Sequence, residues 1–548
     1  MSAGDLNFVR FGIEQQLILT SAQMRTTEQR AIDAGAVTGL ALMEIAAQGV
    51  LDALFLAEPY SASGCHRALV LCGPGNNGGD GFAIARLLQA AGWCVKVGFH
   101  GTLAQLPPDA AANAQLWLET NALTPIADIC EEEVTRADVV IDALFGTGLK
   151  RPICIRVWEL LECVAASSAT VVAVDIPTGI NSDTGQILRE EPAGSLEESI
   201  VESDKKAAWP RVNHTVTFQR LKPAHLLATS APLGMNTLSI VDLGIEKFEP
   251  DQDETNIIHM SGMPPNLYKQ NLAHKYEHGH AVVLSGGVGK GGAGRLAAHA
   301  ALRIGAGAVT LACPTAAVPE NAAQLNAVML APLDGSKGLD DLLCDTRKNS
   351  ICLGPAMGVN DRTKEMVLTA LYSKRHIVLD ADALTSFAMD SSTLFQATHP
   401  GCVLTPHEGE FARLFPDLTE KTSLPNSASS KIDMVRAASI RADCVVLLKG
   451  AVTIIGCPTG QVKLSAALAE RSAPWLATAG SGDVLAGFIT GFMARGFDPM
   501  SAASAGVWLH VECAKIFGPG LIAEDLSNMV PRVLSEWDCE QRKGKTAQ

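Results

Sequence analysis

The feature that most constrains the fold of this chain is an apolar run ending in a cluster of five glycines, ALVLCGPGNNGGDGFAIARLLQAAG at residues 68–92. The apolar run is typical of a β-strand, and the segment after Asp80 is typical of an amphipathic helix. Glycine lacks a Cβ, so the backbone here can approach a ligand closely. Free N–H groups at a helix start favour anions by about 0.3–1 kcal/mol per charge. The stretch therefore predicts a strand, a ligand-binding loop and a helix.

The glycine spacing G-x-G-x-x-G over 73–78 also matches the fingerprint of dinucleotide-binding folds. That fingerprint requires an acidic residue about 20 positions on, at the end of the next strand. The next strand, WCVKVGFH, contains none. The loop instead carries the side-chain oxygens of Asn76, Asn77 and Asp80, which suit a hydroxylated ligand or a hard cation. The alternative, an ordinary turn with Asp80 as N-cap, needs fewer glycines than are present.

Composition narrows the class of protein. A chain of 548 residues exceeds the usual size of one core, so we expect two domains. A net charge of −15 argues against nucleic-acid binding. The start MSAGDLNFVR does not resemble a signal peptide, and we expect no apolar run of the ~18–20 residues that span a bilayer, hence no membrane partner. The 14 cysteines include no C-x-x-C pair and predict reduced thiols in a cytoplasmic protein, not disulfides or a zinc site.

The first half of the chain alternates helical and strand patterns. A helical pattern over 21–56 precedes the predicted strands ALVLC, VKVGF, VVIDALF, VVAVDIP and HTVTF. This order predicts a doubly wound parallel sheet, in which ligands bind beyond the carboxyl ends of the strands. Asp142, Asp175 and Thr178 lie at or just after such ends, as does the segment Gly146–Pro152. We expect them to meet residues 76–80 in one crevice.

Two polar segments interrupt the alternation. Residues 188–209, LREEPAGSLEESIVESDKKAAW, are acidic and predict a surface excursion. Residues 247–266, KFEPDQDETNIIHMSGMPPN, are polar and contain prolines, and we place the linker there. The predicted domains are 1–250 and 251–548.

The second half repeats the alternation. The strand HAVVLSGG leads into GVGKGGAGRLAAHAALRIGAG, a glycine-rich loop that enters a helix. This loop is not a Walker A motif, because Lys290 is followed by Gly291 and not by Ser or Thr. Further predicted strands end in LGPAMG, DADALT, LTPHEGEF and LLKGAVTII.

The segment Ala479–Asp483, AGSGD, starts another helix. Its N–H groups can hold a transferring phosphoryl group, and Asp483 can accept a hydroxyl proton, a role worth roughly 10²–10⁴-fold in rate. The alternative is that Asp483 is an ordinary helix cap. His407 can be structural or catalytic, and Lys449, at a strand end beside a glycine, is favoured to face a phosphate.

Taken together, the motifs resemble those of the bifunctional NAD(P)H-hydrate repair enzymes over nearly the whole chain. In the first half these are GPGNNGGDG, DALFGTGLKRP, VVAVDIPTGI and HTVTFQRLKP. In the second half they are HKYEHGH, GGAGRLAAHAALRIGAG, LGPAMG, DADALT, LTPHEGEF, VVLLKGAVTII and AGSGDVLAGFI. The family joins an NAD(P)H-hydrate epimerase, with a Rossmann-like α/β/α sandwich, to an ADP-dependent NAD(P)H-hydrate dehydratase with a ribokinase-like fold.

The resemblance implies a repair reaction on damaged cofactors. The nicotinamide ring of NADH or NADPH can add water at C6, giving R and S hydrates (NADHX and NADPHX) that the epimerase interconverts. Asp175 is the candidate acid/base, and K⁺ would be bound by Asn77, Asp142 and Thr178. The positions that would hold the hydrate are Asn76, Asn77, Gly78, Gly79, Asp80, Gly146, Thr147, Gly148, Leu149, Lys150, Arg151 and Pro152.

For the second domain, the resemblance implies an ADP-dependent dehydration of the S hydrate, with Asp483 as the base. The nucleotide phosphorylates the hydrate hydroxyl and phosphate then leaves, with Mg²⁺ expected on the nucleotide phosphates. The positions for the hydrate are Ala293, Gly358, His407 and Asp483. The positions for the adenine nucleotide are Lys449, Gly450, Ala451, Val452, Thr453 and Gly482.

Two other interpretations stay open. The second domain can be a ribokinase-like small-molecule kinase, which would release a stable phosphorylated product. The first domain can be a binding module without activity, because fold alone does not assign function. The resemblance also implies a homo-oligomer.

Overall fold

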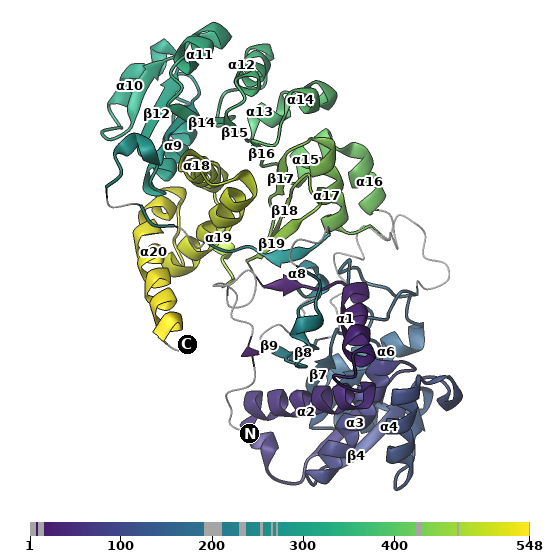
Figure 1. Cartoon of the computed structure of the whole chain (residues 1–548). Coiled ribbons are helices and arrows are strands. Elements are labelled where there is room, and N and C mark those ends of the chain that lie inside the picture. Colours follow the sequence, from purple (N-terminus) through teal and green to yellow (C-terminus); the bar gives the residue numbers. More distant parts are fainter. Residues whose placement is uncertain are drawn as a thin grey trace. The chain divides into compact units, whose positions relative to one another are not determined.

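A computed structural model describes residues 7–8, 16–190, 211–228, 237–251, 256–264, 267–269, 272–423, 429–467 and 471–546. The chain divides into two compact units, formed mainly by Leu17–Glu254 and by Thr255–Gln548 (Figure 1). The domain boundary predicted from the sequence lies between residues 250 and 251. Of the acidic segment 188–209, the part from 191 onward lies outside the described residues.

Within the described residues, the first unit is built on one mixed sheet of eight strands, ordered β1-β9-β8-β7-β6-β3-β4-β5. All neighbouring strands are parallel except β1 and β9. The five predicted strands are present. The strands are β1 (Asn7–Phe8), β3 (Arg67–Cys72), β4 (Cys94–Phe99), β5 (Thr124–Pro125), β6 (Val139–Ala143), β7 (Thr170–Val174), β8 (His214–Phe218) and β9 (Thr237–Val241).

Alternation along the strands builds a core on each face of this sheet. Ala68 and Val70 of β3 join one buried cluster with residues of α2, α3 and α4, whereas Leu69 and Leu71 join a second cluster with residues of α6. Because successive strand residues point to opposite faces, both faces are apolar and both are covered by helices. The predicted α/β/α sandwich is confirmed. The helices are α1 (Ser21–Asp33), α2 (Gly39–Ala57), α3 (Asn76–Ala90), α4 (Pro108–Leu118), α5 (Glu131–Thr135), α6 (Ile155–Ala166) and α8 (Ala224–Leu227).

The helical pattern predicted over 21–56 is confirmed as two helices. They are separated because Gly35 adopts φ +67° and the Thr38 side chain then caps α2 by accepting from the Ala41 N–H. The predicted start of the next helix is wrong. The helix after β3 begins at Asn76, so Asn76–Asp80 form its first turn and not a loop. Its N-cap is Gly75, so the alternative of Asp80 as N-cap is also wrong.

Helix α2 corrects the expectation that no apolar run is long enough to span a bilayer. Its 19 residues have a mean hydropathy of 1.7 over an 18-residue window, enough by length and composition to cross a membrane. Half of that window is buried, and α2 packs against α3, β8 and β9. The core helix of a globular unit meets the same criteria, and the packing of α2 accounts for its apolar character.

The second unit carries its own sheet, in which strands β13-β12-β11-β14-β15-β16-β17-β18-β19-β10 are neighbours in that order. Strands β13 to β17 are parallel, β17, β18 and β19 are antiparallel, and β10 runs parallel to β19. The strands are β10 (Ile258–Met260), β11 (His280–Leu284), β12 (Ala308–Cys313), β13 (Met329–Pro332), β14 (Lys348–Leu353), β15 (His376–Leu379), β16 (Cys402–Leu404), β17 (Val445–Leu448), β18 (Val452–Gly456) and β19 (Val462–Ala466).

Two segments differ here from the sequence analysis. The run CVVLLKGAVTII is a hairpin, with β17 and β18 joined by a turn at residues 449–451. The predicted linker 247–266 contains strand β10, which pairs with β19; residues 252–255 and 265–266 of it lie outside the described part.

The helices of the second unit lie along this sheet (Figure 1). They are α9 (Gly292–Arg303), α10 (Val318–Ala322), α11 (Gly335–Leu343), α12 (Asp361–Tyr372), α13 (Asp382–Thr385), α14 (Ser391–Ala397), α15 (Glu408–Leu414), α16 (Pro416–Ser423), α17 (Lys431–Arg441), α18 (Ser481–Ala494), α19 (Pro499–Phe517) and α20 (Ala523–Thr546). Helix α18 packs closely on the alanine-rich α9, since a Cβ on Gly487 would lie 2.3 Å from the Ala297 carbonyl oxygen. This contact buries α18 and holds the AGSGD segment at its start.

Candidate active sites

The first unit contains a cavity of about 600 Å³ beyond the carboxyl ends of β3, β6 and β7. Strand β3 lies between β4 and β6 in the sheet. The chain continues from β3 to β4 and β5 on one side and then returns to β6 on the other side, so a crevice opens at the carboxyl end of β3. The predicted residues that line the cavity are Asn76, Asn77, Asp80, Gly146, Thr147, Gly148, Leu149, Lys150, Arg151 and Asp175. The predicted residues outside the lining are Gly78, Gly79, Asp142, Pro152 and Thr178.

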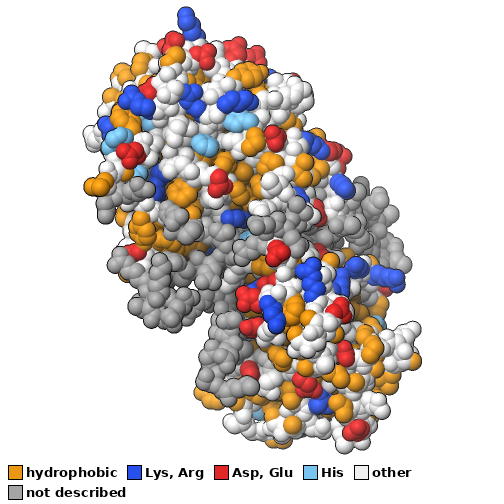
Figure 2. All heavy atoms as spheres, viewed as in Figure 1, with side chains coloured by type: hydrophobic (Ala, Val, Ile, Leu, Met, Phe, Trp, Pro, Cys, Tyr) orange, Lys and Arg blue, Asp and Glu red, His pale blue; other side chains and the backbone are white. Residues whose placement is uncertain are grey.

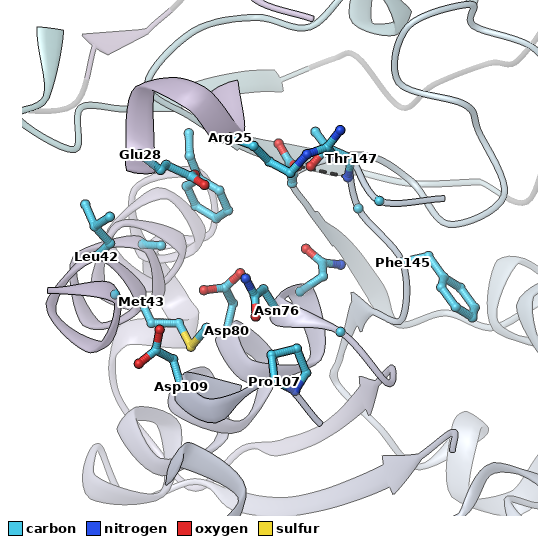
Figure 3. Close-up of a pocket in the computed structure, with 18 of the residues that line it drawn as sticks. Arg25, Glu28, Leu42, Met43, Asn76, Asp80, Pro107, Asp109, Phe145 and Thr147 are labelled. Carbon is cyan, nitrogen blue, oxygen red and sulfur yellow. Dashed lines mark hydrogen bonds between the residues drawn. The ribbon is translucent and has the colours of Figure 1, made fainter. Parts of the chain in front are cut away.

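Helices α1 and α3 bring carboxyl groups to this cavity from different sides. Figure 3 shows Asn76 and Asp80 of α3 pointing into the space that Arg25 and Glu28 approach from α1. The start of α1 is anchored by Ser21, whose N–H and hydroxyl donate to the Asp183 carboxylate at 2.7 and 2.6 Å. This anchor fixes the helix that carries Glu28, a residue that sequence reasoning missed.

Asp175 follows β7 and is held in an uncommon conformation. It adopts φ +65°, in the left-handed region, and its side chain is buried. Oδ1 accepts from the Thr217 hydroxyl at 2.8 Å and lies 2.9 Å from Lys222 Nζ, while Oδ2 accepts from the Thr147 N–H at 3.3 Å. A Cβ on Gly146 would lie 3.2 Å from Asp175 Oδ2 and 2.9 Å from Asn77 Oδ1, so the glycine makes room for both side chains.

The carboxyl groups of the cavity have opposite proton affinities. Burial disfavours the Asp175 anion, but the charge and hydrogen bond of Lys222 outweigh it, so the pKa of Asp175 lies below its usual value. Burial, together with the negative charges of Asp175 and Glu28, raises the pKa of Asp80 well above its usual value. Burial also raises the pKa of Glu28. The cavity thus pairs an ionised carboxylate with carboxyl groups that tend to keep a proton, the combination that acid–base catalysis requires.

The predicted K⁺ ligands Asp142 and Thr178 lie together beneath the cavity. The Thr178 hydroxyl and N–H donate to the two Asp142 oxygens at 2.6 and 2.9 Å, and both residues are buried. Burial raises the pKa of Asp142, and within the described part of the chain no neighbouring cation acts on it. A carboxylate without counter-charge, a hydroxyl and the Asn77 amide are the hard oxygen donors that suit an alkali cation, so these residues fit K⁺.

Sequence reasoning missed Lys222 and His225, which contact Asp175 from behind. The signal was present in the motif HTVTFQRLKP, because a lysine just after a buried strand is unusual unless it is paired. The sequence did not reveal that the partner of Lys222 is Asp175, because this pairing depends on how β7 and β8 lie beside each other.

In the second unit, Asp483 lies in the first turn of α18, after Gly480 as N-cap with φ +88°. Burial and the negative charge of Asp380 raise the pKa of Asp483 to about 6, with Lys449 opposing and Asp382 adding to the rise. Lys449 follows β17, and its Nζ lies 2.6 Å from Asp380 Oδ1. A Cβ on Gly482 would lie 3.6 Å from Lys449 Nζ, so the lysine faces the start of α18. Sequence reasoning singled out DADALT as a motif but missed Asp380 as a site residue.

The other predicted residues of this unit lie at the carboxyl edge of the same sheet. His407 caps α15, with Nδ1 accepting from the Gly409 and Glu410 N–H groups, and pairs with Lys449 in a parallel β-bridge. The Gly358 N–H donates to Asp382 at 2.8 Å. Ala293 lies in the first turn of α9, which packs along α18. Residues 450–453 form the turn and start of the β17–β18 hairpin, where the Thr453 hydroxyl donates to the Gly450 carbonyl oxygen at 3.2 Å.

Comparisons with known proteins agree with a two-part chain. Residues 39–224 match the family described as YjeF-related protein N-terminus, and residues 281–531 match the family described as NAD(P)H-hydrate dehydratase. The bifunctional NAD(P)H-hydrate repair enzyme Nnr of Salinibacter ruber is 32% identical, over 96% of this chain and 97% of that protein. That of Coxiella burnetii is 30% identical, over 93% and 98%. A crystal structure of the ADP/ATP-dependent NAD(P)H-hydrate dehydratase from Bacillus subtilis, 27% identical, matches 49% of this chain and 94% of its own with a TM-score of 0.42.

Proposed function

Because the chain belongs to the family of bifunctional NAD(P)H-hydrate repair enzymes, we propose that it restores NADH and NADPH from their hydrates through one active site in each unit. The first unit is an NAD(P)H-hydrate epimerase, and the second, ribokinase-like unit is an NAD(P)H-hydrate dehydratase. The observation that supports the assignment of sites is that Asp175 follows β7 and lines the cavity of the first unit, and that Asp483 lies in the first turn of α18 near Lys449.

In the second unit, Asp483 takes the proton of the C6 hydroxyl of the S hydrate. The hydroxyl oxygen then attacks the terminal phosphorus of ADP, giving a phosphate ester and AMP. Loss of a proton from C5 and of phosphate from C6 restores the dihydronicotinamide ring. The N–H groups of Gly480 and Gly482, at the start of α18, and the ammonium of Lys449 beside it would hold the phosphoryl oxygens, with Mg²⁺ entering as part of the ADP co-substrate.

In the first unit, Asp175 accepts the C6 hydroxyl proton while Asp80 supplies a proton to the ring nitrogen. The C6–N1 bond opens, C6 becomes an aldehyde carbon, and N1 carries the proton from Asp80. Closure on the other face of the aldehyde reverses both proton transfers and inverts C6. The raised pKa of Asp80 and the lowered pKa of Asp175 favour these opposite roles.

We also propose that the epimerase unit binds K⁺ through Asn77, Asp142 and Thr178. K⁺ would supply the counter-charge that the buried Asp142 lacks in the described part of the chain. The Phe145 N–H donates to Thr178 at 3.0 Å, so these residues hold the segment after β6 that lines the cavity. Replacing K⁺ by tetramethylammonium should reduce epimerisation and leave Asp142→Asn, already impaired, insensitive to the exchange. Equal wild-type rates in both salts would remove K⁺ from the proposal.

The experiment that tests the function is recovery of reduced-nicotinamide absorbance from mixed R and S NADH hydrate with Mg²⁺ and ADP or ATP. The intact chain should restore all of the hydrate with its preferred nucleotide. Recovery by Asp175→Asn should stop at the share of the S epimer. Recovery by Asp483→Asn should be at least about 100-fold slower, while chromatography should show that this variant still interconverts the epimers. A stable phosphorylated product from another alcohol, without recovery, would favour the kinase alternative. Full recovery with Asp175→Asn would remove that residue from the mechanism.

We further propose that the enzyme is located in the cytoplasm and that it forms a homo-oligomer. All 14 cysteines fall within the described residues and are free, as suits a reducing compartment. Figure 2 shows acidic and basic side chains interspersed over the visible face, and the net charge of −15 disfavours nucleic acid as a partner. Light scattering on the purified chain tests the assembly.

A further inference from the structure

The segment after β8 contacts Asp175 at two points. Lys222 Nζ lies 2.9 Å from the Oδ1 atom of Asp175, and His225 Nε2 lies 2.8 Å from its backbone carbonyl oxygen. Lys222 and His225 are each 1% exposed, so both contacts are sealed from solvent. The carboxylate and the backbone of one residue are therefore held by neighbouring side chains of another segment.

The hydrogen bonds of His225 determine its tautomer. The Lys222 N–H donates to His225 Nδ1 at 2.9 Å, so Nδ1 carries no proton. Nε2 then carries the proton and donates it to the Asp175 carbonyl oxygen. Burial and the charge of Lys222 lower the pKa of His225 to about 4, which keeps the ring neutral at physiological pH. The ring acts as a fixed hydrogen-bond donor and not as a proton carrier.

The ammonium of Lys222 has no donor left for a substrate. Besides Asp175, its Nζ donates to the Thr217 hydroxyl and to the Phe218 carbonyl oxygen, both at 2.9 Å. Among the described residues, the wall of the cavity includes Asp175 but not Lys222. Oδ1 of Asp175 is occupied by Lys222 and Thr217, which leaves Oδ2 as the oxygen on the cavity side.

The backbone at Asp175 requires this support. A non-glycine residue at φ +65° is strained and persists only where its surroundings hold it. The Asp175 N–H donates to the Val216 carbonyl oxygen at 2.7 Å, and the His225 ring holds the carbonyl on the other side. With this backbone conformation, the side chain of Asp175 reaches the cavity.

We infer that Lys222 and His225 form a two-point clamp that holds Asp175 ionised, with Oδ2 toward the cavity, and that both are positioning residues of the epimerase. The inference rests on the proposed function of the first unit. Other ionisable groups around Asp175 are Arg25 and Glu28 on α1 and Asp80 on α3, all of which line the same cavity. Burial opposes the Asp175 anion, and among the described neighbours the Lys222 ammonium contributes most to stabilising it.

The test compares Lys222→Met in the full chain with the wild type. The variant keeps the length of the side chain but removes the ammonium, so we expect epimerisation to fall by at least about 100-fold. We also expect the acid limb of its pH–rate profile to move to higher pH, because Asp175 loses the charge that lowers its pKa. Dehydration of pure S hydrate by the same molecule should stay unchanged, which reports on folding of the second unit.

The outcomes separate the clamp from the function on which it rests. If the wild type does not epimerise the hydrates, the proposed function of the first unit fails. If the wild type is active and Lys222→Met has the same rate and acid limb, the clamp is wrong. A purely structural lysine would lower the amount of folded enzyme and leave the acid limb of the remaining activity in place.

Two milder variants keep the test decisive if Lys222→Met does not fold. Thr217→Val removes one hydrogen bond each from Asp175 Oδ1 and Lys222 Nζ and keeps the ion pair. We expect a loss of about 10-fold in kcat with little change in KM. His225→Phe removes the hydrogen bond to the Asp175 backbone and the acceptor of the Lys222 N–H but keeps the Lys222 ammonium, and we expect a similar loss in kcat with the acid limb unmoved. Wild-type kcat in both variants would overturn the clamp.

Discussion

Nζ of Lys449, at the end of β17, lies 2.6 Å from Oδ1 of Asp380, at the end of β15. The Thr405 hydroxyl, just after β16, donates to the same oxygen at 2.8 Å. One buried carboxylate thus joins the ends of three neighbouring parallel strands. This arrangement holds the ammonium beside the start of α18, where we propose that the nucleotide phosphates bind.

We expect Asp380→Asn to change the dehydratase in two ways. Lys449 loses its ionic partner and becomes mobile, so KM for ADP should rise several-fold. The negative charge of Asp380 raises the pKa of Asp483, so its removal should move the acid limb of the pH profile to lower pH. Initial rates over a range of ADP and pH check both effects. Asp361→Asn, whose side chain is 94% exposed, is the matched control and should behave as the wild type.

The pH dependence of the dehydratase follows from Asp483 itself. The base must be ionised, and its pKa is raised to about 6. The value of kcat/KM should therefore be constant above about pH 7 and fall tenfold per pH unit below pH 6. Asp483→Asn should lose roughly 10²–10⁴-fold in kcat and lack this acid limb. A wild-type rate that stays flat down to pH 5 would contradict Asp483 as the base.

Two glycines at the start of α3, the N-cap Gly75 and Gly78 in the first turn, offer a matched pair of substitutions. A Cβ on Gly78 would lie 1.9 Å from the Gly73 carbonyl oxygen, whereas a Cβ on Gly75 would meet nothing within 4 Å. Gly78→Ala should destabilise the first unit by about 1–3 kcal/mol, because only backbone movement relieves the clash. Gly75→Ala should leave the unfolding of that unit nearly unchanged. Chemical denaturation, with the loss of epimerase activity as the signal, distinguishes the two variants. Equal destabilisation would contradict the close approach of Gly78 to the Gly73 carbonyl oxygen.

A buried ion pair supports the segment before the AGSGD motif. Arg471 Nε donates to Glu512 Oε1 of α19 at 2.8 Å, and Arg471 is 1% exposed. Glu512→Ala would leave the guanidinium buried without its anion, so we expect a loss of about 3–5 kcal/mol in unfolding free energy. The exposed helix pair Arg532–Glu536 is the control, and Glu536→Ala should cost less than about 1 kcal/mol. Urea denaturation measures both; similar small losses would contradict the role of the pair.

Local patterns predicted the parts of this chain that depend on neighbours in sequence. The apolar runs of the first unit predicted β3, β4, β6, β7 and β8, because burial on both faces of a parallel sheet requires nearly continuous apolar residues. The helix starts were less accurate. Helix α3 begins at Asn76 and not at Asp80, because Gly75 is the N-cap with an extended backbone and the following residues already adopt helical backbone angles. The strand end at Lys449 was predicted, but the return of the chain into β18 was not, since apolar residues flank the turn at 449–451 on both sides.

The sequence by itself determined two α/β units, glycine-rich helix starts at residues 73–81 and 479–483, and the candidate carboxylates Asp175 and Asp483. These follow from periodicity and from the rule that parallel strands present their carboxyl ends at one edge. Only the tertiary structure decided which cations face those carboxylates. Asp380 and Lys449 are 69 residues apart in the chain, and Lys222 reaches Asp175 because β8 lies beside β7. Proton affinity depends on burial and on charges a few ångströms away, and those distances exist only once the sheets have formed.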